Sequence, residues 1–228
     1  MRVTYLGHSG FLAEWGGAAC LFDFTEGTLP VLPAGETLLV FVSHAHGDHF
    51  SPRIFAECAG AAAFVLSNDI SKRRVPEGLP VVRVSPGGTY DLPGGLTAAA
   101  TASTDAGVSF LVRGGGKTVY HAGDLNWWAW PDDTEAEARD MRGRFLHELK
   151  SLSGARPDAA FLPLDGRLGE NYALGFDAFL AALEPAAAFP MHQWGDYALT
   201  RRYLARPESA PWRDRVRAVE RPGQTFEW

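Results

Sequence analysis

The sequence has few of the residues and segments that mark secreted or membrane proteins. Only two of its 228 residues are cysteine, Cys20 and Cys58, and they lie in separate segments without the spacing of a zinc ribbon. We expect two free, buried thiols in a reducing cytosol. No apolar run reaches the roughly 20 residues of a membrane span, and the N-terminus lacks the apolar stretch of a signal peptide. A cytoplasmic protein without membrane association is therefore predicted.

Basic residues are also scarce. The chain has 21 lysines and arginines against 27 acidic residues, a formal net charge of −6. The densest basic run, residues 72–74, is short and more typical of a solvated helix face than of a nucleic-acid surface. Nucleic acid is therefore not the expected partner, although a local basic patch is not excluded.

The remaining composition, 46% hydrophobic and 21% charged, is that of a globular protein with a sizeable core. Short apolar runs predict strands at 3–6, 11–15, 18–24, 37–43, 62–67, 81–84, 96–103, 108–113, 117–121, 158–164, 186–190 and 215–220. Helices are predicted at 51–58, 69–74, 134–152, 172–183 and 197–205. Early hairpins followed by helices between later strands indicate sheets covered by helices, in a single domain over residues 1–228.

Three histidines and one aspartate fall within six residues directly after the apolar strand 37–43, in the run His44-Ala45-His46-Gly47-Asp48-His49. Neutral imidazole is the commonest metal ligand because it offers a lone pair without a proton to lose. The spacing places His44 and His46 on one side of an extended loop and turns Asp48 and His49 toward a second point. The alternative is a polar loop whose histidines bond to backbone. Because spacing matched to two adjacent metals has little other structural use, we favour a metal centre.

This run resembles the His-x-His-x-Asp-His signature of the metallo-β-lactamase superfamily, and the likeness extends in order along nearly the whole chain. Residues 6–12 and the strand ending in Asp23 look like the start of the family, closest to its lactonase-like branch. Residues 122–124 resemble its bridging-aspartate segment, and residues 191–192 its last metal histidine. Residues 121–128 are similar to an uncharacterised bacterial subgroup. The resemblance implies an α/β fold, a four-layer αββα sandwich with the site at the sheet edges.

Carried over residue by residue, the resemblance implies ligands from several segments. They are His44 and His46 for a first metal, Asp48, His49 and His192 for a second, and Asp124 as the bridge between the two. Asp124 as an ordinary turn residue after Gly123 is the alternative. Asp23 is expected to orient the ligand loop without binding metal.

One departure from the family pattern concerns the first metal. The family supplies a further histidine from the strand pair between its two aspartate motifs, but this chain has no histidine between His49 and His121. Asp105 is the only strong ligand in the matching segment, and we predict that it replaces the histidine. If Asp105 is instead a turn residue before Gly107, the first site is weak or empty. A carboxylate favours Mn²⁺ or Fe over Zn²⁺, so one or two ions of Zn, Mn or Fe are expected.

The expected chemistry is hydrolysis by a metal-bound hydroxide. A divalent metal lowers the pKa of its water from about 15.7 toward 7, and Asp48 and Asp124 would orient the hydroxide for attack on a carbonyl or phosphorus centre. The favoured substrate is a small-molecule lactone, ester, amide or phosphodiester. Two alternatives stay open: an RNA-processing nuclease of the same fold, which the acidic balance disfavours, and a non-catalytic metal-binding sensor or scaffold, which the missing histidine favours.

Four residues are candidates for contact with the substrate. Trp127 and Trp128 belong to a cluster of three tryptophans within residues 127–130, which would form an aromatic wall, a contact between subunits of a homo-oligomer, or a hydrophobic cap on the sandwich edge. Arg167 would clamp a carboxylate or phosphate, or pair with a neighbouring acidic residue such as Asp165. Tyr172 is the fourth candidate, and His8 is an additional candidate for the lining of the pocket.

Overall fold

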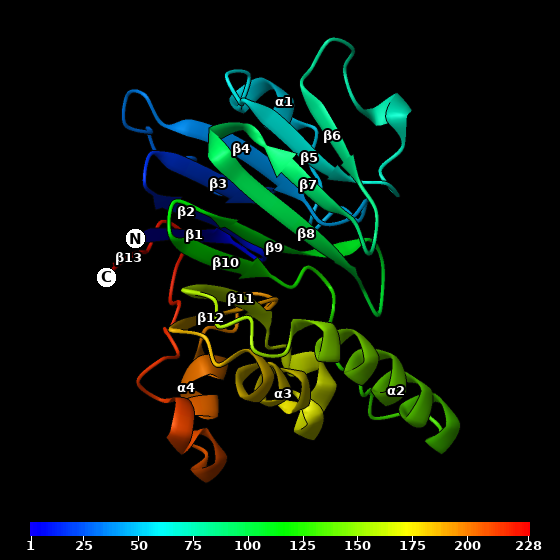
Figure 1. The fold of residues 1–228 in the computed structure, drawn as a ribbon. Helices are drawn as coiled ribbons and strands as arrows, with labels where there is room; N and C mark the ends of the chain where they lie inside the picture. The colour runs from blue at the N-terminus through cyan, green and yellow to red at the C-terminus, as the bar shows by residue number, and fades with distance from the viewer.

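The structure, a computed structural model, describes residues 1–228 and contains two β-sheets with helices on their outer sides (Figure 1). The seven strands of the first sheet are, in spatial order, β13 (Thr225–Glu227), β1 (Arg2–Gly7), β2 (Gly10–Trp15), β3 (Ala18–Phe22), β4 (Thr37–Val42), β5 (Ala63–Ser67) and β6 (Val81–Val84). The six strands of the second sheet are β12 (Ala187–Met191), β11 (Ala159–Pro163), β10 (Lys117–His121), β9 (Val108–Gly114), β8 (Leu96–Ala102) and β7 (Thr89–Leu92).

The helices lie on opposite sides of this pair of sheets. Figure 1 shows α1 (Arg53–Glu57) beyond the first sheet and the other three helices beyond the second. Those three are α2 (Glu135–Leu152), α3 (Leu174–Leu183) and α4 (Ala198–Ala205). Four 3₁₀ turns complete the structure: η1 (Lys72–Arg74), η2 (Pro93–Gly95), η3 (Gly166–Asn171) and η4 (Pro207–Trp212). No helix is both long and apolar enough to cross a bilayer.

Strand β4 shows why the sheets stack. Successive side chains of a strand point to opposite faces, so an apolar run on both faces needs cover on both sides. Leu39 and Phe41 enter the main core between the sheets, whereas Val40 and Val42 enter a smaller core with Ile54 of α1. Each such buried side chain contributes roughly 1.5–3 kcal/mol. The strand predicted at 37–43 is therefore confirmed, and it is covered on both faces.

Helix α2 follows the pattern expected from its sequence. Thr134 and Glu137 form a reciprocal capping box at its start. Phe145, Leu149 and Leu152, spaced to share one face, are buried, and the Phe145 ring lies 5.2 Å from that of Phe179 on α3.

Three local predictions are wrong or incomplete. Residues 215–220 do not form the closing strand; Val216 makes only an isolated bridge to Ala188. The turn that follows, where Gly223 has φ 79°, redirects the chain so that β13 pairs with β1. The helix predicted at 69–74 shortens to η1, because the Ser71 side chain accepts from the Arg73 amide at its start. Strand β7 was not predicted, since its short polar sequence gives little signal.

Strand direction places the functional residues at one edge of the sandwich. In the first sheet β3 and β4 are parallel, and β1 runs the same way because two antiparallel pairings separate it from β3. In the second sheet β10, β11 and β12 are parallel, and β8 shares their direction for the same reason. Loops that follow the carboxyl ends of these strands therefore meet, as they do at ligand sites of other α/β sheets.

Candidate metal centre

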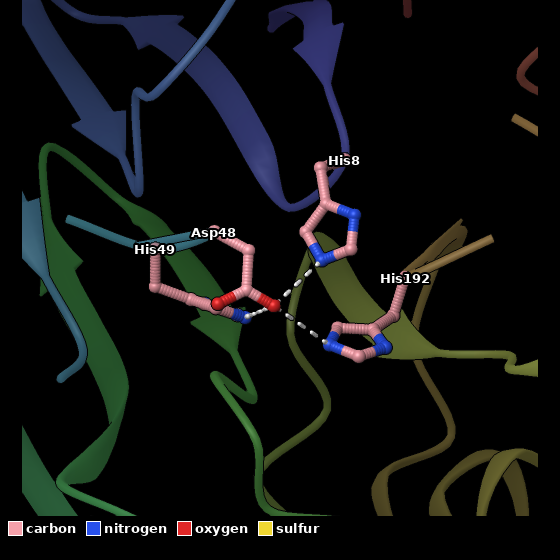
Figure 2. A group of neighbouring side chains, drawn as sticks. All are labelled: His8, Asp48, His49 and His192. Carbon is pink, nitrogen blue, oxygen red and sulfur yellow. Dashed lines mark ion pairs between the residues drawn. The ribbon is translucent and has the colours of Figure 1, made fainter. Parts of the chain in front are cut away.

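Two groups of four ligand-type side chains meet at this edge, and within each group one nitrogen or oxygen atom per residue lies within 4.8 Å of the others. The first group contains His44, His46, Asp105 and Asp124, and the second contains His8, Asp48, His49 and His192 (Figure 2). Every residue predicted as a metal ligand therefore belongs to one of the two groups, and His8 is an addition.

The first group joins the loop after β4 to the turn between β8 and β9. Nδ1 of His46 lies 3.6 Å from Oδ2 of Asp105, and Nε2 of His44 lies 3.5 Å from Oδ2 of Asp124. Gly107 lets the two segments approach: it has φ 66°, and a Cβ there would overlap the carbonyl oxygen of Ser43. Asp105 thus belongs to a turn and also faces His46. A place in the turn is therefore compatible with the predicted role of Asp105 as a metal ligand.

The second group surrounds the carboxylate of Asp48. Its Oδ2 lies 3.4 Å from Nε2 of His8, 3.8 Å from Nε2 of His192 and 4.0 Å from Nε2 of His49. Figure 2 shows the three imidazoles converging on this oxygen from different segments of the chain.

Asp124 connects the two groups. Its Oδ1 lies 3.0 Å from Nε2 of His49 and 3.4 Å from Nε2 of His192, whereas its Oδ2 faces His44. One carboxylate therefore presents one oxygen to each group, which is the arrangement that a bridging ligand requires. Asp124 follows β10, and its backbone oxygen accepts a hydrogen bond from Nε1 of Trp128 at 3.0 Å.

Two buried carboxylates contact histidine rings of the site on the side opposite Nε2, at Nδ1. Asp23 is fully buried; it accepts hydrogen bonds from the backbone and hydroxyl of Ser43 at 2.8 and 2.6 Å, and its Oδ2 lies 2.7 Å from Nδ1 of His49. Asp165 likewise lies 2.8 Å from Nδ1 of His192. Such outer contacts set the tautomer and orientation of a ligand histidine. In both rings they leave Nε2 directed at the group.

The electrostatics keep the site in a form suited to a cation. Burial lowers the pKa of His8 and of His44, which favours the neutral rings that bind metals. Burial disfavours a charge on Asp124 as well, but His49 and His192 hold the pKa of that carboxyl well below its usual range. His49 differs, because the carboxylates of Asp124 and Asp23 outweigh its burial and raise its pKa to about 10.

Unpaired atoms test whether these residues fit a metal. Eleven buried side-chain nitrogen or oxygen atoms form no hydrogen bond, and five of them belong to these residues: Nε2 of His8, His44, His49 and His192, and Oδ1 of Asp124. Buried polar atoms are normally paired, and an unpaired one is costly. Nearly half of these unpaired atoms thus face one site, and nitrogen and carboxylate oxygen are ligands that divalent transition metals accept. The residues therefore fit one cation in each group.

A cavity of about 330 Å³ opens over the two groups. Its lining residues are His46, Asp48, Thr104, Asp105, Asp124, Trp128, Trp130, Met141, Arg167, His192 and Trp194. The indoles of Trp128 and Trp130 stack at 8° with centroids 6.0 Å apart. The Arg167 guanidinium lies 5.5 Å from the ring centroid of Trp130 and 4.6 Å from that of Trp194.

The four predicted substrate residues separate into two pairs. Trp128 and Arg167 line the cavity, and Arg167 also forms the alternative pairing, with Nε 3.0 Å and Nη2 2.6 Å from Oδ2 of Asp165. Trp127 and Tyr172 do not line it. The Trp127 ring instead lies 6.1 Å from that of Phe145 on α2, and Tyr172 lies against the Arg206 side chain.

Sequence reasoning missed two residues of the site. His8 was only a pocket candidate, although an imidazole at the carboxyl end of β1 was a usable signal. Trp194 was not considered; its ring lies 4.5 Å from His8 and 5.5 Å from His192. No sequence pattern marks Trp194, because its position depends on a loop in which His192, Trp194 and Gly195 all have positive φ.

Comparison with known proteins identifies the class. Residues 2–138 match the Beta-lactamase superfamily domain. A UPF0173 metal-dependent hydrolase of Heliobacterium modesticaldum is 33% identical over 213 residues, which cover 84% of this chain and 82% of the relative. Igni18, a metallo hydrolase of Ignicoccus hospitalis, superposes with a TM-score of 0.70 at 25% identity, covering 100% of this chain and 98% of the other. The metallo-β-lactamase fold protein YhfI of Bacillus subtilis superposes with a TM-score of 0.65 at 16% identity, covering 99% of each chain.

These likenesses, together with the two-sheet architecture, show that the fold is the metallo-β-lactamase fold. The chain belongs to the beta-lactamase superfamily and, within it, to the UPF0173 metal-dependent hydrolases. The predictions of fold, superfamily and enzyme class are confirmed.

Proposed function

We propose that this enzyme uses two divalent cations to hydrolyse a small molecule, with a lactone, ester, amide or phosphodiester as the scissile group. The observation that supports this best is the pair of ligand groups sharing Asp124 on the floor of the 330 Å³ cavity. That volume is at the lower end of the range for small-molecule sites, about 300–1,000 Å³.

In this proposal His44, His46 and Asp105 would hold the first cation, Asp48, His49 and His192 would hold the second, and Asp124 would contact both. Divalent cations bound there would acidify a water molecule and polarise the bond to be cleaved. His8 beside Asp48 holds the pKa of that carboxyl well below its usual range. An ionised Asp48 or Asp124 accepts a hydrogen bond from the attacking water and so orients it for attack.

The first site should prefer a different metal from a site that has a histidine in place of Asp105. With Asp105, the first group offers two imidazoles and two carboxylates, which adds negative charge and hard oxygen donors. Such a set favours Mn²⁺ or Fe relative to Zn²⁺.

The cavity walls support a substrate that is compact and carries an anionic group. Three indoles form apolar walls, and Arg167 is the one lysine or arginine among the lining residues. Arg167 donates Nε and Nη2 to Asp165, and its Nη1 makes no hydrogen bond to the protein. Nη1 is therefore free to donate to a carboxylate or phosphate of the substrate. Only one cationic side chain lines the site, and it is already paired, so an RNA substrate is disfavoured.

The test is a substrate panel with protein loaded with Mn²⁺ or Zn²⁺. Lactones, esters and phosphodiesters would each be offered as matched neutral and carboxylated compounds, with RNA as a further arm. We expect turnover of a small anionic compound and none of RNA. Arg167→Gln should raise KM for the carboxylated compound roughly tenfold, as expected for loss of a charged hydrogen bond, and leave the neutral one unchanged.

Arg142→Gln is the matched control, because the Arg142 guanidinium lies over Trp127, outside the cavity. Cleavage of RNA in preference to every small molecule would contradict the proposal. So would a fully metallated protein that is inactive on the whole panel, a result that would support the sensor alternative.

A further inference from the structure

We infer that His8 is a direct ligand of the second cation, in addition to Asp48, His49, His192 and the shared Asp124. This inference rests on the proposed two-metal site. It adds a residue from the first strand connection to a site otherwise built from the His44–His49 loop and the second sheet.

The position of the imidazole supports this assignment. Of the three histidine Nε2 atoms around Oδ2 of Asp48, that of His8 is the nearest, at 3.4 Å, against 3.8 Å for His192 and 4.0 Å for His49. Two neighbouring ligands of one ion, each about 2.0–2.1 Å from it, lie roughly 2.9–3.6 Å apart. His8 is therefore as well placed as His49 and His192, the two histidines that the family resemblance assigns to this cation (Figure 2).

The unpaired state of Nε2 is a second, independent observation. The His8 side chain is 8% exposed, and its Nε2 is buried without a hydrogen bond. A histidine that served only to fill space would turn this atom toward solvent or toward a backbone carbonyl. Here it faces the carboxylate of Asp48 and lies within 4.8 Å of the ligand atoms of His49 and His192, an arrangement that a bound cation would satisfy.

The backbone holds the ring in this direction. His8 has φ 41°, a conformation uncommon for a residue other than glycine, and such strain concentrates at functional sites. Its carbonyl oxygen accepts a hydrogen bond from the His192 amide at 3.3 Å. Its ring contacts those of His192, at 4.4 Å, and Trp194, at 4.5 Å. The backbone hydrogen bond and the ring contact therefore both hold His8 beside His192, which follows β12 and belongs to the same group.

The inference also gives the two cations different surroundings. The second cation would have five protein ligands, namely the four residues of its group and Asp124. The first cation would have four, namely His44, His46, Asp105 and Asp124. The second cation would then have fewer free positions, leaving the first as the one more open to substrate.

The experiment compares wild type, His8→Ala and His8→Gln, loaded with Co²⁺ as the probe metal. Metal content after dialysis and Co²⁺ affinity would be measured first. Exchangeable imidazole N–H signals shifted by the paramagnetic ion then report the number of bound histidines. We expect one fewer such signal in both variants, and Co²⁺ affinity of the second site reduced at least 100-fold in His8→Ala. His147→Ala, on the exposed face of α2, is the control and should match wild type.

A role limited to hydrogen bonding with Asp48 predicts a different result. In that case His8→Gln, which retains a donor, would keep near-normal affinity, and neither variant would lose a histidine signal; this outcome overturns the inference. Melting curves of the metal-free proteins show whether a variant folds, and a misfolded His8→Ala would leave His8→Gln to decide. A wild type that binds no metal would refute the proposed function itself, which is a distinguishable result.

Discussion

The two ligand groups lie at the same sheet edge but differ in how firmly the fold encloses them. In the second group the side chains of His8, His49 and His192 are at most 8% exposed. In the first group His44 is buried, but the side chains of His46 and Asp105 are 55% and 49% exposed. Chemically similar ligand sets are therefore placed in two different environments.

The outer contacts differ in the same way. Carboxylates of Asp23 and Asp165 orient two rings of the second group. In the first group, His44 has only the Ser43 hydroxyl, 3.0 Å from its Nδ1, and His46 has no partner beyond Asp105. Preorganised ligands bind more tightly because less freedom is lost on binding. The comparison thus indicates a tight, structural second site and a labile, accessible first site.

Removing Asp23 should have the largest effect, because it disrupts the support of the second group. Asp23→Ala leaves the Ser43 amide unpaired and removes the partner of His49. We expect a loss of about 3 kcal/mol in the free energy of unfolding of the metal-free protein, measured by urea denaturation, together with loss of the second metal. Asp91→Ala, at an exposed position of β7, is the control. Equal stabilities of the two variants would contradict this role.

Partial metal removal tests the comparison directly. Titration of the loaded protein with a chelator should remove one metal first, with affinities that differ about 100-fold, the upper range for contacts that orient ligands. Metal content at each step provides the measurement. Simultaneous loss of both metals would show that the enclosure of the second group has no energetic consequence.

Changing Asp105 should alter the first site alone. Asp105→Ala is expected to weaken the first metal by roughly 10- to 100-fold and leave the second in place. Asp105→His should shift the preference of the first site from Mn²⁺ toward Zn²⁺ about tenfold, because it exchanges a hard oxygen for a nitrogen ligand. Competition between the two metals measures both effects. Full occupancy in Asp105→Ala would leave Asp105 as a turn residue only.

The smallest effect concerns pH and the second site. The pKa of His49 is raised to about 10 in the metal-free protein, so the ring carries a proton at neutral pH that a metal must displace. The apparent affinity of the second site should rise up to tenfold per pH unit below that pKa. Calorimetry in buffers of different ionisation heat should detect about one proton released on binding. Absence of proton release at pH 7 would contradict the charged state of His49.

Much of the fold is readable from local patterns. The apolar run of β4 and the spacing of Phe145, Leu149 and Leu152 on α2 each reflect one element burying its own apolar residues. The closing strand was not readable, because residues 215–220 resemble a strand as well as β13 does. Only pairing with β1, at the far end of the chain, selects β13.

The residues of the site likewise separate into those that the sequence predicted and those that only the assembled fold brings together. The sequence by itself determined the run from His44 to His49, because neighbouring ligands on one loop need only local geometry. It also indicated, through order and resemblance, that Asp124 and His192 belong with that run. Only the tertiary structure decided that Asp105 faces His46, that His8 joins the second group and that one group is enclosed while the other is open. These relations depend on which strands share a direction and end at one edge, a property of the assembled sheets that no single segment contains.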